Sequence, residues 1–472
     1  MTFYFFDLET SGFSGRYDRI MQFGGQRTDE NFKPISEPDN FLIKMTPDVL
    51  PQPEAVLVHG ITPQKTISEG ISEADFCRYL TSQVSVRDTV IVGYNNIRFD
   101  NEFVRFTLWR NLYDAYEWSW KNNCSTWDLL DVVRMTRALR PDGIKWPFDA
   151  DGKPTNRLEF LGALNNLEHT DAHDALSDVQ VLISLARLLK EKQPKLFDYL
   201  LKHRQKAKIV PLVESGRPVV YTSGRYPGQF NKTTLAIMVA KTSDSSGALM
   251  YDLRADPDEF TNLSAVQLAA KWTARGEDAP YFPVKVLKYN RCPAVAPIEV
   301  LAKANGYENL QLNKNKVSDH LKKLQKAKEF DKKLLDALEL MWPKKQNSVP
   351  SNNIDADSQL YDGFIPDSDK SLLRQAQNLA PEKLDSLKFK DRRLQMLLFL
   401  YKVRNFPRLL NLDEQLQWDD FRRRKLMGGG FSDRYFKRLE ELASASAIDE
   451  KKRYLIEELN LYAQSLMPIP AD

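Results

Sequence analysis

Two acidic residues, Asp7 and Glu9, end a short apolar run near the start of the sequence. Residues 2–6 are aromatic and β-branched, and the breakers Ser11 and Gly12 follow, so the run predicts a buried strand. Side chains two residues apart in a strand project to the same side, which brings the two carboxyl groups together. A cation between them relieves their repulsion, and hard oxygen ligands select Mg²⁺ or Mn²⁺. Because an isolated Asp-x-Glu is common on solvated strand ends, a metal site requires further acidic ligands.

Two later segments supply such ligands. Residues 90–94 predict a second short strand, and Asp100 follows it where an Asn-rich turn gives way to a helical pattern. Junctions of this kind bind ligands in α/β proteins, although capping the helix is the commoner role for an Asp. From Asp174 to Lys190 the apolar residues again recur at helical spacing. Asp174 is placed to cap this helix, and Asp178, one turn inside it, projects from a fixed position that suits a metal ligand.

These carboxylates suit phosphodiester hydrolysis, in which two metal ions about 3.5–4 Å apart hold the attacking and the leaving oxygen. A base must also take a proton from water near neutral pH, which suits a histidine. His173 stands at the start of the helix that carries Asp178 and is the candidate base. His59 is its main rival and is interpreted as part of a substrate-side loop. The other histidines are expected to be solvated or on the surface: His169, His203 and His320.

The three motifs resemble those of the DEDDh exonucleases in their order and approximate separation. They are Asp-x-Glu on the first strand, Asn-x-x-Phe-Asp in the middle and His-x4-Asp on a later helix. Matched residue by residue, the resemblance implies metal ligands at Asp7, Glu9, Asp100 and Asp178 and a general base at His173. Further segments resemble the bacterial exodeoxyribonuclease I family over nearly the whole chain: residues 94–102, 127–132, 139–144, 157–159, 172–175, 283–286, 359–364 and 401–407. Proofreading subunits, oligoribonuclease and ribonuclease T share the three motifs but are much shorter.

The resemblance implies three structural parts, and the pattern of predicted strands and helices along the sequence agrees with it. Residues 1–192 alternate strands and helices, as an α/β, ribonuclease H-like exonuclease domain should. Residues 193–346 have short alternating strands and predict an SH3-like β-barrel domain, with helices inserted around residues 263–273 and 313–341. A polar linker follows at residues 347–358. Residues 359–472 are helical in period, with breaks at Pro381, Pro407 and Gly428, and predict a C-terminal all-helical domain.

The activity that the resemblance implies is hydrolysis of single-stranded DNA in the 3′→5′ direction to 5′-mononucleotides, in DNA repair and recombination. It implies two Mg²⁺ ions per site, with Mn²⁺ able to substitute. The polarity follows from the resemblance alone. Two alternatives stay open: a catalytically silent DNA-binding scaffold, and an RNA-directed enzyme of the same superfamily. A metal-dependent hydrolysis assay distinguishes the scaffold from an active nuclease. The rates of hydrolysis of matched DNA and RNA oligomers distinguish a DNA-directed from an RNA-directed enzyme.

A single strand of DNA is held by a positive channel and by aromatic faces on which its bases stack. The segment after Asp100 interleaves these residue types: Arg105, Tyr116, Trp118, Trp120 and Arg134. Large rings are core residues by default, so the alternative is that two of the three aromatic residues are buried. The resemblance favours Tyr116 and Trp120 as DNA contacts, together with Arg105 and Arg134. Arg157 is expected to bind the scissile phosphate or its neighbour, and Glu9 to contact substrate as well as metal.

Charge and cysteine content support a nucleic-acid enzyme of the cytoplasm. The chain has 472 residues and a net charge of only +3, but eight lysines against three acids lie between Lys314 and Lys333. Seven basic residues against one acid lie between Lys388 and Arg408. Such clusters favour phosphate contacts, although a solvated helix face is commoner. The three cysteines are too scattered for a disulfide framework, and the sequence shows neither a signal peptide nor a membrane-spanning run. A monomer is expected.

A protein partner is also expected. Bacterial single-stranded DNA-binding proteins end in an acidic tail with a terminal apolar residue, and the resemblance to exodeoxyribonuclease I implies that the chain binds this tail. Such a tail requires a basic rim and an apolar pocket. Arg140 and Tyr199 are the candidates for charge and pocket wall, and Lys314 and Lys316 for the rim. The alternative is that Arg140 pairs with a local acid and that Tyr199 is merely packed.

Overall fold

The computed structural model describes residues 1–167, 174–276, 279–303, 305–342, 355–445 and 448–467. The candidate base His173 and residues 347–354 of the predicted linker lie outside the described residues. Contacts divide the chain into two compact units. Unit 1 comprises residues 1–125, 169–182 and 350–472, and unit 2 comprises residues 126–168 and 183–349. Unit 1 therefore combines segments from both ends of the sequence.

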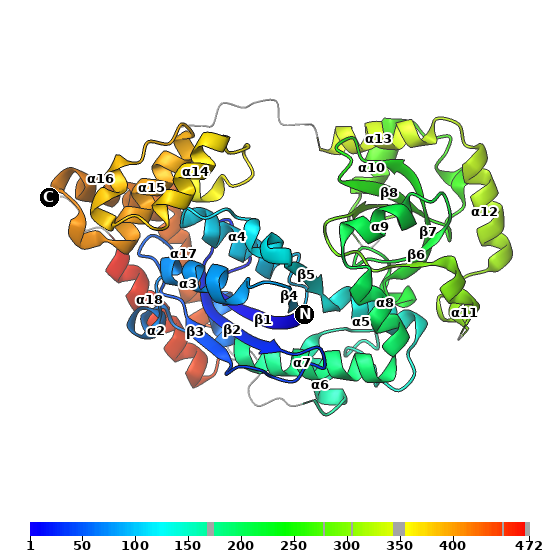
Figure 1. Ribbon diagram of the computed structural model, residues 1–472, viewed down its shortest axis with the longest axis horizontal. Coiled ribbons are helices and arrows are strands. Elements are labelled where there is room, and N and C mark those ends of the chain that lie inside the picture. Colours follow the sequence, from blue (N-terminus) through cyan, green and yellow to red (C-terminus); the bar gives the residue numbers. More distant parts are fainter. Residues whose placement is uncertain (168–173, 277–278, 304, 343–354, 446–447, 468–472) are drawn as a thin grey trace. The chain divides into compact units, whose positions relative to one another are not determined.

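Unit 1 is built on a five-stranded sheet with the order β3-β2-β1-β4-β5 (Figure 1). Its strands are β1 (Thr2–Thr10), β2 (Ile20–Thr28), β3 (Asp39–Leu42), β4 (Thr89–Gly93) and β5 (Ser125–Asp128), the last of which spans the boundary of the two units. β1 pairs antiparallel with β2 and parallel with β4, so it is the central strand. The strands predicted at residues 2–6 and 90–94 are confirmed, and β1 continues through Asp7 and Glu9.

Helices from both ends of the sequence complete unit 1. The N-terminal helices are α1 (Pro53–His59), α2 (Pro63–Glu69), α3 (Glu73–Tyr79), which continues as a π-helical turn (Leu80–Val84), and α4 (Asp100–Arg110). The C-terminal helices are α14 (Asp367–Ala376), α15 (Arg392–Asn405), α16 (Leu412–Met427), α17 (Phe431–Ala443) and α18 (Glu450–Leu466). The breaks predicted at Pro381, Pro407 and Gly428 all fall between these helices.

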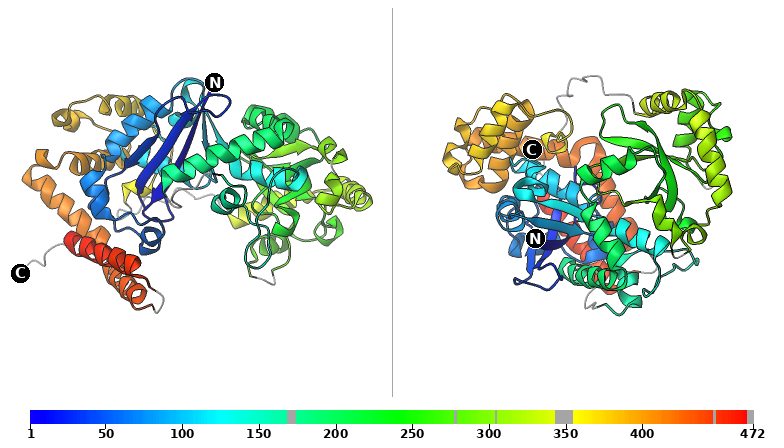
Figure 2. Two further views of the ribbon diagram at one scale, coloured as in Figure 1. Left: turned by 90° about the horizontal axis from the view of Figure 1, so that it is seen from below. Right: turned by 45° about the vertical axis from the view of Figure 1, so that its right-hand side comes forward.

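The C-terminal helices share hydrophobic cores with the N-terminal segment. In one core, Phe106 and Trp109 of α4 pack with Leu397 and Leu400 of α15. In a second core, α18 packs against α1 and α2. In Figure 1 and Figure 2, α18 is the red helix that lies against the blue N-terminal segment, and α15 is orange. Neither segment buries its apolar surface without the other.

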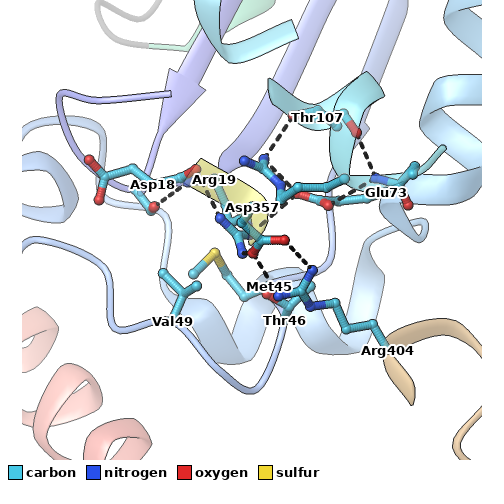
Figure 3. Close-up of polar contacts among 12 residues, drawn as sticks. Asp18, Arg19, Met45, Thr46, Val49, Glu73, Thr107, Asp357 and Arg404 are labelled. Atoms are coloured by element: carbon cyan, nitrogen blue, oxygen red, sulfur yellow. Dashed lines mark hydrogen bonds and ion pairs between the residues drawn. The ribbon is translucent and has the colours of Figure 1, made fainter. Parts of the chain in front are cut away.

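Buried ion pairs also join the two ends of the chain in unit 1 (Figure 3). Arg19 lies 2.8 Å from Asp357, and Arg404 lies 2.7 Å from both Asp357 and Asp48. Lys425 lies 2.8 Å from Asp48. All of these side chains except Lys425 are at least 96% buried. Ions taken this far out of water persist only when they are paired.

Nearby, the same network continues through Glu73, which lies 3.1 Å from Arg110 and 3.6 Å from Arg19. Burial opposes ionisation of Asp48 and Asp357, but the charges of Arg404 and Lys425 outweigh it and hold the pKa of both carboxyls below the usual range. We call Arg19, Asp48, Glu73, Arg110, Asp357, Arg404 and Lys425 the buried ion network.

Unit 2 contains an antiparallel sheet with the order β10-β6-β7-β8-β9. The strands are β6 (Val219–Thr222), β7 (Thr233–Lys241), β8 (Gly247–Asp252), β9 (Val284–Lys288) and β10 (Val295–Pro297). The helices are α5 (Leu129–Leu139), α6 (Leu158–Leu164), α8 (Pro194–Lys202), α9 (Lys206–Val213), α10 (Ala265–Thr273), α11 (Gly306–Asn309), α12 (Lys314–Lys326) and α13 (Phe330–Met341). The long helix α7 (Ala175–Lys192) begins in unit 1 and ends in unit 2. The helices predicted around residues 263–273 and 313–341 are confirmed.

One histidine expected on the surface of this unit is buried instead. His320 lies on α12 and is 7% exposed, and its Nδ1 lies 2.8 Å from the carbonyl oxygen of Leu253. The prediction was wrong because the lysines of α12 mark its solvent face, whereas His320 lies on the face that packs. None of the helices in the described part of the chain combines the length and the apolar character needed to cross a bilayer.

Candidate active site

The carboxylates Asp7 and Glu9 lie on β1, at the centre of the sheet of unit 1. The alternate residues Phe6 and Leu8 are buried in a core with Ile91 of the neighbouring strand. Because side chains alternate along a strand, the apolar residues hold β1 on one side while the two carboxylates share the other. The predicted convergence of Asp7 and Glu9 follows from this alternation.

A glycine on β2 lets α7 approach these carboxylates. Gly24 lies opposite Asp7 in the strand register. A Cβ atom at Gly24 would lie 2.4 Å from the main chain of Ala175, so a side chain there would push away the first turn of α7, which carries Asp178. Gly24 was not among the predicted functional residues. The available signal was two successive glycines, Gly24 and Gly25, inside an apolar strand.

Gln22, also on β2, fixes the start of α7 by two hydrogen bonds. Its side chain donates to a carboxylate oxygen of Asp174 at 2.7 Å and accepts from the backbone N–H of Ala175 at 3.3 Å. Asp174 in turn accepts a hydrogen bond from the backbone N–H of Ser177 at 3.1 Å, which confirms its predicted capping role. Gln22 was likewise missed by the sequence analysis, since nothing in the local sequence of β2 indicates its partner.

Three carboxylates meet where β1 and α7 approach each other. One oxygen of each of Asp7, Glu9 and Asp178 lies within 4.8 Å of the others. Asp100, the first residue of α4, is outside this group of three but is 4% exposed and acts on it electrostatically. The structure therefore brings together three of the four predicted metal ligands and places the charge of the fourth within reach of them.

The charges at this point repel one another. Burial, and then the charges of Asp100 and Asp178, raise the pKa of Asp7 well above its usual range. Burial and the charges of Asp178 and Asp100 also raise the pKa of Glu9 to about 8. Every contribution to these two shifts raises the pKa, so like charge surrounds both groups. Hard oxygen donors held together against their repulsion fit a divalent cation.

Histidines near the carboxylates are only partly described. His173 and His169 lie outside the described residues. His59 ends α1 rather than lying in an open loop, and its Nε2 lies 3.2 Å from the carbonyl oxygen of Thr10. Its Nδ1 accepts a hydrogen bond from the backbone N–H of Ile61 at 3.0 Å. These contacts tie His59 to the end of β1.

Close to Asp100, Arg105 of α4 lies next to aromatic side chains from other segments of unit 1. Arg105 donates a hydrogen bond to Glu102 at 2.6 Å and lies over the ring of Tyr116, 5.5 Å from its centroid. Tyr361, from the C-terminal segment, donates to the same Glu102. Arg105 and Tyr116 thus lie side by side, and the guanidinium of Arg105, like that of Arg134, is held by a neighbouring acid.

The three aromatic residues predicted in this segment differ in burial. Trp118 is 2% exposed, whereas Tyr116 is 41% and Trp120 is 60% exposed. One of the three rings is therefore buried, and not two as in the alternative. The two that the family resemblance favoured as DNA contacts are the exposed ones.

A groove of about 300 Å³ lies at the start of α4. Its lining includes Phe13, Arg16, Arg98, Phe99, Glu102 and Tyr361. Phe99 immediately precedes Asp100, and the ring of Phe13 is 67% exposed. The groove offers aromatic faces and two guanidinium groups next to a candidate metal ligand.

The remaining predicted DNA contacts belong to unit 2. Arg134 donates a hydrogen bond to Asp131 at 2.7 Å, and both side chains are 15% exposed. Arg157 precedes α6, has a 70% exposed side chain, and lies 3.8 Å from Glu159. Arg157 is thus available to a phosphate, whereas Arg134 is held by a neighbouring acid.

The four predicted partner-binding residues also belong to unit 2. Arg140 donates to the carbonyl oxygens of Leu139 and Val300 at 2.6 and 2.9 Å. Tyr199 stacks on His203 with 4.0 Å between ring centroids, and burial raises its pKa to about 12. On α12, the ammonium group of Lys314 lies 4.8 Å from the ring centroid of Tyr307, and Lys316 is exposed. Arg140 is thus bound to backbone carbonyls, which differs from the acid pair considered as its alternative.

Comparisons with known proteins cover nearly the whole chain. Family models described as "Exonuclease", "Exonuclease I SH3-like domain" and "Exonuclease I C-terminal domain" match residues 4–186, 204–339 and 354–466. The predicted fold classes and their order along the chain are thereby confirmed. The predicted boundaries (1–192, 193–346, 347–358 and 359–472) stay a prediction.

Similar proteins are found by sequence and by structure. Exodeoxyribonuclease I of Escherichia coli strain K12 is 38% identical, over 99% of this chain and 98% of that protein. A crystal structure of E. coli exonuclease I in complex with a dA16 oligonucleotide has a TM-score of 0.92 and 38% identity, covering 99% of this chain and 100% of that one. A crystal structure of SSB/Exonuclease I in complex with the inhibitor CFAM has a TM-score of 0.88 and 36% identity, covering 99% of each chain.

Proposed function

Because this chain belongs to the exodeoxyribonuclease I family, we propose that it hydrolyses single-stranded DNA from the 3′ end and releases 5′-mononucleotides. The observation that carries this proposal is the group of carboxylates Asp7, Glu9 and Asp178, with Asp100 acting on it. The relative's complex with an oligonucleotide supports a DNA substrate. The 3′→5′ polarity, a role in DNA repair and recombination, and action as a cytoplasmic monomer extend from the family resemblance.

The proposed cofactor is Mg²⁺, two ions per site, with Mn²⁺ able to substitute. Asp7, Glu9, Asp100 and Asp178 would hold the ions, because carboxylate oxygens are the ligands that these cations prefer. When bound, divalent cations would neutralise the charge of the phosphodiester and favour loss of a proton from water near neutral pH. The raised pKa values of Asp7 and Glu9 support this fit, since a cation relieves the repulsion that raises them.

The protein's own residues position the substrate and move the proton. His173 is proposed as the base that accepts a proton from the attacking water. Asp174 and Gln22 hold the first turn of α7, so that Asp178 keeps its position against β1. Arg157 is proposed to bind the scissile phosphate or its neighbour, which its exposed guanidinium supports.

The DNA strand is proposed to follow the aromatic and basic surface beside α4. Phe13 and Tyr361 in the groove, with Tyr116 and Trp120 nearby in the same unit, offer faces on which bases stack. Arg105 supplies positive charge from unit 1, and Arg134 is proposed as a further contact from unit 2. Stacking is tolerant of sequence, so this surface favours an enzyme that degrades any single strand.

The test is a product ladder from a 5′-labelled single-stranded DNA with Mg²⁺, with Mn²⁺ and with EDTA. We expect stepwise shortening with either metal and none with EDTA or with Asp7→Asn. Matched RNA and duplex DNA should be degraded much more slowly. Intact DNA with both metals would favour the silent scaffold, and RNA degraded as fast as DNA would favour the RNA-directed enzyme.

The role of His173 has its own test. His173→Ala should lower kcat by about 10²–10⁴-fold, as expected for a lost general base. The Mg²⁺ concentration that gives half-maximal activity should stay that of the unmodified enzyme. A midpoint shifted as far as in Asp178→Asn would instead make His173 a metal ligand. An equal loss of kcat in His59→Ala would reopen the choice of base.

We also propose that the chain binds the acidic C-terminal tail of single-stranded DNA-binding protein. The solved SSB/Exonuclease I complex of a relative supports this class of partner. Arg140 and Tyr199 would contact the end of the tail, and Lys314 and Lys316 would form the rim. Arg140→Glu should abolish binding of a tail peptide and spare hydrolysis of bare DNA. Unchanged peptide affinity at low salt would exclude Arg140 from the site.

A further inference from the structure

A short hairpin in unit 2, residues 147–155, carries an exposed aromatic ring that has no role in the site described above. The hairpin lies between α5 and α6. Phe148 pairs with Pro154 in a β-bridge, and the backbone N–H of Thr155 donates to the carbonyl oxygen of Pro147. Phe148 is 59% exposed. Packing in a hydrophobic core therefore does not account for an aromatic residue at this position.

Arg137, on α5, fixes the two arms of this hairpin and the ring of Phe148. Its guanidinium donates hydrogen bonds to the carbonyl oxygens of Pro147 and Thr155 at 3.0 and 2.6 Å. The same group lies 4.9 Å from the ring centroid of Phe148, and Arg137 is only 5% exposed. A guanidinium that lies over an aromatic face is attracted to it, so this contact holds the ring in place. Because Arg137 covers one face of the ring, the exposed area lies on its edge and its opposite face.

The hairpin leads directly to Arg157, the proposed phosphate contact. The guanidinium of Arg137 also lies 3.3 Å from the side-chain oxygen of Asn156, the residue before Arg157. Arg157 in turn lies 5.8 Å from the ring centroid of Phe160, which is 41% exposed. One buried side chain thus supports both Phe148 and the segment that ends in Arg157. A DNA strand with a phosphate at Arg157 therefore has the open face of Phe148 close to it.

The charges of the hairpin favour a base over a phosphate as the group that meets this ring. The turn carries two exposed carboxylates, Asp149 and Asp151, against one ammonium group, that of Lys153. Asp149 accepts hydrogen bonds from the backbone N–H groups of Asp151 and Lys153 at 3.0 and 2.8 Å. Like charges repel, so the turn directs a phosphodiester backbone away from itself. A nucleobase is uncharged, and its π-face stacks on an aromatic ring.

We propose that the open face of Phe148 is a stacking site for one nucleobase of the DNA strand, next to the phosphate that Arg157 binds. The site takes any of the four bases, because stacking requires only a π-face. This inference deepens the proposed function and rests on it, since Arg157 is assigned there to a phosphate of the same strand.

The experiment combines a substitution in the protein with a missing base in the DNA. The full-length protein carries Asp7→Asn and is held in EDTA, so that binding of a single-stranded oligonucleotide is measured by fluorescence anisotropy without turnover. Phe148→Ala in this parent should weaken binding about 5–150-fold, the effect of one lost stacked base. Phe148→Trp should retain the affinity. The matched control is Val266→Ala, at a 67% exposed residue of α10 in the same unit, and should leave the affinity unchanged.

An abasic site moved along the oligonucleotide from its 3′ end identifies the base that stacks. At one position the missing base should weaken binding to the parent and have no further effect in Phe148→Ala, because both changes remove the same contact. The loss in Phe148→Ala should also be equal at about 50 and 200 mM salt, since stacking releases no counterions.

Three results would overturn the inference while leaving the proposed function in place. The first is unchanged affinity in Phe148→Ala. The second is an equal loss in Phe148→Ala with the intact and with every abasic oligonucleotide, because the substitution would then act through the shape of the hairpin. The third is a loss that disappears at the higher salt concentration. A parent protein that binds no single-stranded DNA would overturn the proposed function and this inference together.

Discussion

Unit 1 contains two groups of buried charges that are built in opposite ways. In the buried ion network, carboxylates such as Asp48 and Asp357 alternate with guanidinium and ammonium groups at 2.7–2.8 Å. In the catalytic candidate group, Asp7, Glu9 and Asp178 face one another. Burial alone would raise the pKa of Asp357, but the positive charge of Arg404 outweighs it and lowers the pKa. The pKa of Asp7 is instead raised both by burial and by its acidic neighbours.

This contrast distinguishes the buried ion network, whose charges stabilise the fold, from the carboxylate group, whose charges fit a bound cation. A balanced buried network needs nothing further, and its removal exposes an unpaired ion. An unbalanced group is maintained against its own repulsion, and active sites are where such perturbed groups cluster. The two groups therefore should respond with opposite signs to the removal of one carboxylate.

The largest expected effect on stability is in the ion network. Asp357→Ala should lower the free energy of unfolding by about 3–5 kcal/mol, since it removes a buried carboxylate that both Arg19 and Arg404 contact and leaves the network with excess positive charge. Urea unfolding followed by circular dichroism measures this change. Activity per folded molecule should stay the same. Asp419→Ala is the control, because Asp419 forms an exposed ion pair with Arg422 and should cost less than about 1 kcal/mol. Equal losses in both variants would contradict a structural role for the network.

Removing a carboxylate from the catalytic group should have the reverse outcome. Asp7→Asn should reduce kcat by well over the roughly 10–100-fold that even an outer partner of a metal ligand contributes. In EDTA it should raise the free energy of unfolding by about 0.5–2 kcal/mol, because it removes one of several repelling charges. Nuclease assays and urea unfolding of the same preparation test both halves. An Asp7→Asn protein that is less stable than the unmodified protein would contradict the opposite responses expected of the two groups.

Acid should weaken the ion network. The folded-state pKa values of Asp48, Glu73 and Asp357 are lowered, so in acid the unfolded chain binds more protons than the folded protein. Their contribution to stability is complete above the unfolded values of about 4 and is lost as the pH falls below them. We expect a loss on the order of 1 kcal/mol for each strongly paired carboxyl between pH 5 and pH 3, about half of what one such aspartate loses by pH 1. The loss, measured by urea unfolding, should be smaller in Asp357→Ala. If the free energy of unfolding of this variant falls with pH as steeply as that of the unmodified protein, the network is not the source of the acid sensitivity.

The smallest effect distinguishes a helix cap from a ligand. Asp174→Ala should cost about 1 kcal/mol of stability, because it removes a helix cap. Its kcat should fall far less than that of Asp178→Ala, which removes a member of the carboxylate group. Steady-state kinetics and thermal melts compare the two. An inactive Asp174→Ala with an active Asp178→Ala would reverse the assignment.

The carboxylate group was largely predictable because its chemistry follows local patterns. Asp7 and Glu9 are two residues apart on a strand, and Asp174 and Asp178 are one turn apart on a helix. Each spacing fixes a relative direction without reference to the rest of the chain. The order of the three structural parts was predictable from the same local textures.

The ion network and the supports of α7 were not predictable. Arg19 and Asp357 are 338 residues apart in sequence, and their pairing depends on the packing of whole segments. Gln22 bonds to Asp174, 152 residues further on, and has no local signature. The Gly24-Gly25 pair indicates a close approach, but not which segment approaches.

Unit 1 joins residues 1–125 to residues from 350 onward, and this has a consequence during synthesis on the ribosome. The N-terminal sheet emerges first, with Trp109 and its neighbours lacking the C-terminal helices that cover them. At about 5–20 residues per second, translation of the intervening segment takes roughly 10–45 s. During that interval the nascent chain presents apolar surface, and Asp48 lacks its partners Arg404 and Lys425. Nascent N-terminal segments should therefore engage chaperones until the C-terminal helices appear.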